Sequence, residues 1–97
     1  MSEHIGTFIQ GSSIISHPIS YTVDGEEVDL SEWELSYNLF NDATKNLIFS
    51  DVITDRHLNI NGAKTEDLKG NFIIQIVFKN GTFVDKNTLL IVTITGV

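Results

Sequence analysis

The stretch "NFIIQIVFK" (71–79) decides the fold class of this chain, because large apolar residues occupy every second position in it. These residues are Phe72, Ile74, Ile76 and Phe78. Side chains two positions apart lie on the same face of an extended strand, whereas an amphipathic helix repeats its apolar residues about every three to four positions. The stretch therefore predicts a β-strand with one face in the core.

The same alternation occurs elsewhere in the chain. "WELSYNLF" (33–40) alternates from Trp33 to Leu39, and "LLIVTIT" (89–95) alternates from Leu90 to Ile94. Shorter candidate strands span residues 5–10, 14–23, 47–53 and 57–60. Short β segments separated by turn residues predict an antiparallel sandwich or barrel of about seven strands.

Turn-forming residues stand between these segments. Asp24-Gly25, Asn61-Gly62 and Asn80-Gly81 accept the positive φ that hairpin turns require. Pro18 has no backbone N–H to donate, which places residues 14–20 at the margin of a sheet. Residues 61–70 are expected to form a loop with a short 3₁₀ turn.

The length of the chain, 97 residues, corresponds to a single domain covering residues 1–97. The absence of cysteine excludes disulfides, thiolate metal sites and cysteine nucleophiles. No apolar run is long enough to span a bilayer, and the first residues lack the pattern of a secretion signal. We therefore expect synthesis and folding inside a cell.

The net charge is −7, and the acidic residues concentrate in the first half of the chain. Residues 1–44 contain no lysine or arginine, whereas acids and bases nearly balance in residues 45–97. Binding to nucleic acid or to an anionic membrane requires a basic face, so neither kind of partner is expected. A basic protein partner stays open.

The acidic stretch "DGEEVD" (24–29) is the first candidate site. Its carboxylates are Asp24, Glu26, Glu27 and Asp29. A calcium loop of the EF-hand type needs acids at alternate positions before its glycine, and here the glycine follows the first aspartate directly. We interpret the stretch as the solvated acidic rim of a hairpin, with metal binding or docking on a basic partner as alternatives.

Other chemistry-bearing residues form no recognisable motif. His4, His17 and His57 lack a metal-ligand spacing, although His4 and His17 would meet if the first two strands paired. "GSSI" (11–14) differs from the nucleophile elbow of hydrolases, and the glycines form neither a phosphate loop nor a dinucleotide fingerprint. We predict no catalytic, cofactor or metal site, and a protein that is not an enzyme.

The second candidate site is an excess of apolar residues. If the alternating set of 71–79 points inward, its neighbours point outward, and the same holds for 89–95. Pairing the two strands would gather four apolar residues on one outer surface, Ile73, Val77, Leu89 and Ile91. Such a patch predicts a protein interface, unless the N-terminal segment folds across it. Residues 1–10 could be a strand or a docking arm.

Residues 8–40, "FIQGSSIISHPISYTVDGEEVDLSEWELSYNLF", resemble the N-terminal immunoglobulin-like domain of phage baseplate upper proteins and related tail and head-fibre proteins. The resemblance consists of Gly11, the Asp24-Gly25 turn, "VDLS" (28–31) and the strand from Trp33. The stretches "GNFIIQIVF" (70–78) and "LLIVTITGV" (89–97) resemble the last two strands of that domain. The domain is a scaffold, so the resemblance implies no catalytic residues.

Periodicity and resemblance together predict an all-β, antiparallel immunoglobulin-like β-sandwich. The expected function is that of a noncatalytic structural component of a bacteriophage virion: a head decoration, head-fibre, tail-adaptor or baseplate subunit. Its expected partners are other virion proteins, in a homo-oligomer or a symmetric multi-copy assembly, and no cofactor is implied. The alternative is a carbohydrate-binding or adhesin-like β-sandwich module, which needs an exposed aromatic residue such as Trp33.

Overall fold

The computed structural model describes residues 2–96 of the chain. This part of the chain consists of β-strands and one short 3₁₀ turn, η1. The elements in chain order are β1 (Ser2–Ile9), β2 (Ile14–Pro18), β3 (Thr22–Val23), β4 (Glu26–Glu27), β5 (Glu34–Asn41), β6 (Leu47–Val52), β7 (His57–Ile60), η1 (Gly62–Lys64), β8 (Gly70–Asn80) and β9 (Phe83–Thr95). The all-β prediction is confirmed, and within residues 2–96 no helix is long and apolar enough to cross a membrane.

Five strands form the principal sheet, in the order β1-β9-β8-β5-β6. Neighbours pair antiparallel except for β1 and β9, which are parallel, so the sheet is mixed. The expectation of a purely antiparallel fold is wrong for this pair. A hairpin turn forces consecutive strands to run antiparallel, but β1 and β9 are far apart in sequence and no turn fixes their direction.

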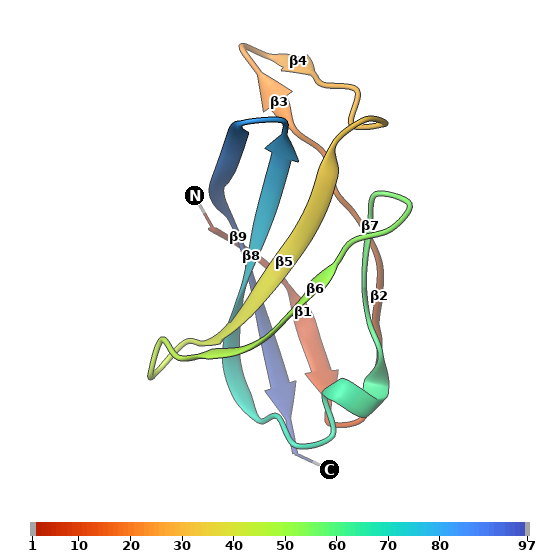
Figure 1. Ribbon diagram of the computed structural model, residues 1–97. Helices are drawn as coiled ribbons and strands as arrows, with labels where there is room; N and C mark the ends of the chain where they lie inside the picture. Colours follow the sequence, from red (N-terminus) through yellow and green to blue (C-terminus); the bar gives the residue numbers. More distant parts are fainter. Residues whose placement is uncertain (1, 97) are drawn as a thin grey trace.

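A second layer packs against this sheet (Figure 1). β2 and β7 form an antiparallel two-stranded sheet. Its side chains Ile14, Leu58 and Ile60 join those of the principal sheet in one buried cluster. The inward residues of β5, β8 and β9 in that cluster are those predicted from the alternation, Leu35, Tyr37, Leu39, Phe72, Ile74, Ile76, Phe78, Leu90, Val92 and Ile94. The edge position predicted for residues 14–20 is also confirmed, because β2 pairs with β7 alone.

The N-terminal segment extends the principal sheet and does not fold across its outer face. β1 lies beside β9 in register from Ser2↔Leu89 to Ile9↔Thr95, with an irregularity between His4 and Gly6. Gly6 has φ +154, a conformation that L side chains rarely adopt, which suits it to this position. Residues 2–9 are therefore a strand.

Two of the three predicted glycine turns occur. Asp24 and Gly25 both have positive φ between β3 and β4, and Gly81 has φ +61 between β8 and β9. Asn61-Gly62 is not a hairpin turn: Asn61 has φ −62 and its side chain caps η1 by accepting the N–H of Ala63. This cap agrees with the expected short 3₁₀ turn within residues 61–70.

Candidate functional site

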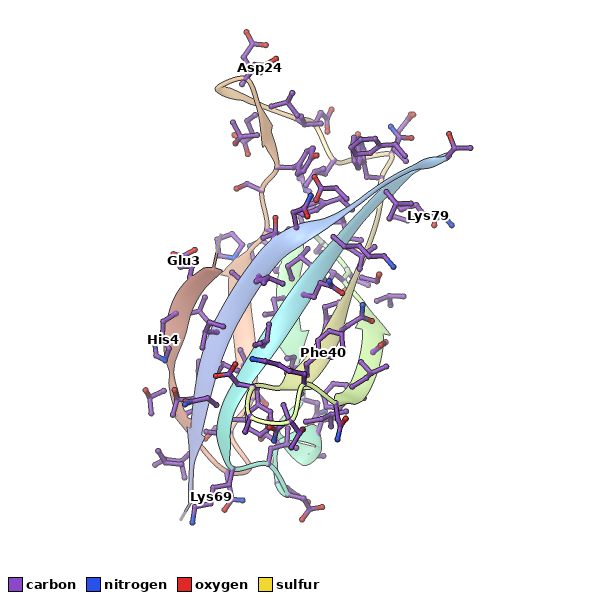
Figure 2. All side chains as sticks on the ribbon, turned by 90° about the vertical axis from the view of Figure 1, so that its left-hand side faces the viewer. Glu3, His4, Asp24, Phe40, Lys69 and Lys79 are labelled. Atoms are coloured by element: carbon purple, nitrogen blue, oxygen red, sulfur yellow. The ribbon has the colours of Figure 1, made fainter. Side chains whose placement is uncertain are left out.

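The outer face of the principal sheet is the side turned away from β2 and β7. Figure 2 views the molecule from this side, with β9 and β8 in front. The strand register places Ile73 between Phe40 on β5 and Ile91 on β9. All three side chains are half-buried, and they form an apolar row across three neighbouring strands. Cross-strand apolar pairs of this kind stabilise a sheet and offer a water-poor surface to a partner.

A polar row lies on one side of the apolar row. Ser50 Oγ donates to Asn38 Oδ1 at 2.6 Å, and Asn38 Nδ2 donates to Gln75 Oε1 at 3.0 Å. Gln75 Nε2 in turn donates to the carbonyl of Lys86 at 3.2 Å. These bonds connect β6, β5, β8 and β9 and leave the amide side chains with fixed orientations.

A second polar group lies on the other side. Thr93 Oγ1 donates to Asn71 Oδ1 at 2.8 Å, and His4 Nε2 is 3.0 Å from the same Thr93 hydroxyl. The outer face is therefore an apolar row between two hydrogen-bonded polar groups.

The four predicted interface residues all lie on β8 and β9, but the structure separates them. Ile73 and Ile91 are direct partners, whereas Leu89 lies opposite Gln75. The bulge between Ile76 and Phe78 interrupts the pairing of β8 with β9, and Val77 is paired with Ser36 on β5. The patch is thus a pair with two flanking residues, each half-buried, and not one continuous group of four.

The most exposed large apolar side chains are not among the four predicted interface residues and were missed from the sequence. They are Ile9, Val23, Leu47, Ile48, Val52, Phe83 and Val84. Val52 on the edge strand β6 is the most exposed of them, at 66%. The prediction treated 47–53 only as a strand candidate. Asking which of its residues would face outward beside Ser36 could have found Val52.

The acidic rim divides into two parts. Asp24, Glu26 and Glu27 lie on the β3–β4 hairpin, which projects beyond the two sheets at the top of Figure 1. Asp29 follows in the next loop, where its Oδ1 accepts the backbone N–H of Ser31 at 3.0 Å. That hydrogen bond lowers the pKa of Asp29 below its ordinary value. The first three carboxylates thus lie on a projecting turn, and the fourth stabilises a local bend.

An aromatic cluster lies below this hairpin. The centroid of the Tyr21 ring lies 4.6 Å from that of Phe78 and 5.5 Å from that of Trp33. The ring centroids of Trp33 and Phe83 are 5.7 Å apart. The Tyr21 hydroxyl donates to Asp85 Oδ2 at 2.6 Å. This bond raises the pKa of Tyr21 and lowers that of Asp85, because the neutral phenol donates to the ionised carboxylate. Trp33 itself is half-buried, between the core and surface positions considered for it.

Two titratable groups on the neighbouring strands β5 and β6 have shifted pKa values, Tyr37 and Asp51. Burial raises the pKa of Tyr37 to about 12, with a smaller contribution from the nearby charge of Asp51. Asp51 Oδ2 accepts from Lys64 Nζ at 2.7 Å, and this bond lowers the pKa of Asp51. Across residues 2–96, no group of three or more histidines, cysteines or acids is placed to hold a metal ion. β1 and β2 do not pair, and the side chain of His17, half of the expected His4–His17 contact, lies outside the described residues.

No protein-family model, curated protein or solved structure matches the chain. The resemblance of residues 8–40 to the phage domain therefore stays a prediction. The function of the chain has to be inferred from its own side chains.

Proposed function

We propose that this chain is a noncatalytic structural component of a bacteriophage virion. It is an immunoglobulin-like β-sandwich that acts through protein–protein contacts, in a homo-oligomer or a symmetric multi-copy assembly with other virion proteins. The contact surface is the outer face of the principal sheet, with Ile73, Val77, Leu89 and Ile91 as its apolar residues. The acidic β3–β4 hairpin lies at the rim, where charge guides association more than it adds affinity.

The row Phe40–Ile73–Ile91 is the observation that carries the proposal. These side chains lie on the face of the sheet opposite the core, so burial in the chain's own core does not explain why they are apolar. The hydrogen-bonded groups beside the row, from Ser50 to Gln75 and from Asn71 to His4, hold their side chains in place before a partner arrives. Preorganised side chains lose less entropy on binding.

The dimensions of the face suit a contact between copies. Five strands about 4.8 Å apart, each with about eight residues rising 3.3 Å, give a face of about 20 by 26 Å. Two copies that pair through this face would bury on the order of 1,000 Å², the lower end for a specific interface. Such a contact is weak for an isolated pair and becomes strong when a particle presents many copies.

The experiment compares the oligomeric state of the purified chain with that of an Ile91→Lys variant by light scattering. A lysine in the apolar row would place two like charges opposite each other in a symmetric contact, so the variant should dissociate to monomer. Val84→Lys is the matched control, because Val84 is exposed and lies at the β8–β9 turn, away from the row. Circular dichroism establishes that both variants remain folded.

A strictly monomeric wild-type chain, with solubility unchanged by Ile91→Lys, would refute the face as a self-interface. The virion role is tested separately. Genes next to the one that encodes this chain should encode capsid and tail proteins, and a neighbourhood without them would contradict it.

A further inference from the structure

We propose that an open groove around Trp33 binds a neutral pyranose sugar. The site goes beyond the structural role proposed above and does not depend on it. Its aromatic residue is the only tryptophan in the chain.

The groove consists of two adjoining hollows. One, of about 260 Å³, is lined on its polar side by Ser31, Asp55 and Arg56. The other, of about 500 Å³, is lined on its polar side by Glu34, Ser36 and Lys79. Both share Trp33, Leu35 and Ile53 as their apolar wall. The second hollow alone, at about 500 Å³, has the size of typical ligand sites, about 300–1,000 Å³.

Trp33 is held in place between the two hollows. Its ring packs against Tyr21 and Phe83 at centroid distances of 5.5 and 5.7 Å, and its backbone N–H donates to the carbonyl of Leu30 at 3.0 Å. The indole is nevertheless only partly buried. A fixed, partly exposed aromatic ring suits the C–H face of a pyranose, which is the apolar side of an otherwise polar molecule.

The charged groups favour a neutral ligand. Each hollow has one acid and one base: Asp55 with Arg56 in the first, and Glu34 with Lys79, 3.9 Å apart, in the second. Each pair brings hydrogen-bond donors and acceptors to the groove, and the carboxylate of Asp29 also interacts with the charge of Arg56. Sugar hydroxyls both donate and accept, so they satisfy such pairs, whereas an anion or a cation would meet one repelling partner.

The turn that carries Asp55 and Arg56 is strained. Their φ values are +54 and +55, a region that aspartate tolerates and arginine rarely adopts. For Arg56 this conformation costs roughly 1–2 kcal/mol. The turn is held by the hydrogen bonds from Ile19 N–H to Arg56 O, 2.8 Å, and from His57 N–H to Thr54 O, 3.2 Å. Strain of this kind often accompanies a site that needs particular side chains, and here it places a carboxylate and a guanidinium at the groove.

The experiment titrates the wild-type chain with methyl α-mannoside, methyl β-galactoside, methyl β-glucoside and N-acetylglucosamine. Emission of Trp33 is followed, because it is the only indole. At least one sugar should give a saturable change with a dissociation constant of about 0.1–10 mM, the range of a small open site. The same sugar should protect Trp33 from quenching by iodide, and glucuronate, which is charged, should bind at least tenfold more weakly.

Two variants test the assigned residues. Arg56→Gly should weaken binding at least tenfold while leaving stability unchanged or higher, because glycine accepts φ +55 without strain. Lys45→Gly is the matched control: Lys45 has φ +61 but lies in the β5–β6 turn, and its variant should bind like wild type. If Arg56→Gly does not fold, Asp55→Asn takes its place, since asparagine tolerates the same φ and loses the charge.

No saturable change with any of the four sugars up to about 100 mM would overturn the proposal, as would tighter binding of glucuronate. Unchanged affinity in Arg56→Gly would overturn the assignment of that residue. Ile91→Lys should leave sugar affinity unaltered, and Arg56→Gly should leave the oligomeric state unaltered. Failure of the groove and failure of the sheet face are thus distinguishable.

Discussion

Replacing Gly62 by alanine should destabilise the chain through a backbone clash. Gly62 is the first residue of η1 and is buried against the segment from Gly11 to Ser13. A Cβ added there would overlap the carbonyl oxygen of Gly11 and lie 3.1 Å from its carbon and 3.3 Å from Ser13 N. These neighbours are backbone atoms, so no flexible side chain can move aside.

The magnitude follows from the contacts that must change. Moving the segment away would disturb the bond from Gly62 N–H to Ser13 Oγ, 2.9 Å, and that from Gly11 N–H to Thr65 Oγ1, 3.2 Å. Two weakened hydrogen bonds and one overpacked contact sum to about 2–4 kcal/mol. For a domain of this size, we expect Tm to fall by about 10–25 °C.

The assay is thermal unfolding followed by circular dichroism, with Gly81→Ala as the control. Gly81 has φ +61 and no atom within 4 Å of an added Cβ, so its variant should lose only about 1–2 kcal/mol from backbone strain. Equal losses of unfolding free energy in the two variants would show that a Cβ at position 62 does not clash with the backbone of Gly11. That result would refute the reasoning.

Three further predictions concern buried and titratable groups. Thr65→Val should cost about 1–3 kcal/mol in urea unfolding, because it removes the acceptor of Gly11 N–H from a buried position; a loss under 0.5 kcal/mol would contradict this. At pH 10, where free tyrosine is about half ionised, ultraviolet absorption of the folded chain should show little phenolate, because the pKa values of Tyr37 and Tyr21 are both raised. The stability that these two groups contribute is present below about pH 10 and is lost as the pH rises beyond it. Half-ionisation of the tyrosines in the folded chain at pH 10 would contradict this prediction. Tyr21→Phe should lower the stability of the chain at neutral pH, because it removes the hydrogen bond to Asp85. The difference from wild type should shrink as the pH falls below about 4, because the lowered pKa of Asp85 contributes stability only while the carboxylate is ionised. A difference in stability that does not depend on pH would exclude the Tyr21–Asp85 hydrogen bond as its source.

Local patterns were enough to predict β5, β8 and the second half of β9, from residue 89, but not the first half of β9 from Phe83. Their alternation is strong, and the residues assigned inward are buried. The parallel partner of β9 was beyond such reasoning. Pairing of β1 with β9 joins residues as distant as Ile9 and Thr95, and a period of two does not encode which distant strand is a neighbour or in which direction it runs.

The candidate sites were predicted less completely. Alternation placed Ile73 and Ile91 together, but the bulge beside Val77 has no sequence signature, and it leaves that residue without a register partner on β9. The turn at Asp55 and Arg56 was missed because arginine is not typical of positive φ and no glycine or asparagine marks the turn. The pattern of the chain therefore predicted the sheet face better than the groove.

The parallel pairing of β1 and β9 also has a mechanical consequence. The start of β1 and the end of β9 lie at opposite ends of the pair, from Ser2↔Leu89 to Ile9↔Thr95. A tensile force that pulls on Ser2 and Thr95 would act along both strands and load their hydrogen bonds in shear. Bonds loaded in shear share the force and break together, whereas a hairpin pulled from its open end unzips bond by bond. The domain should therefore resist stretching between these two points better than an antiparallel pair of the same length.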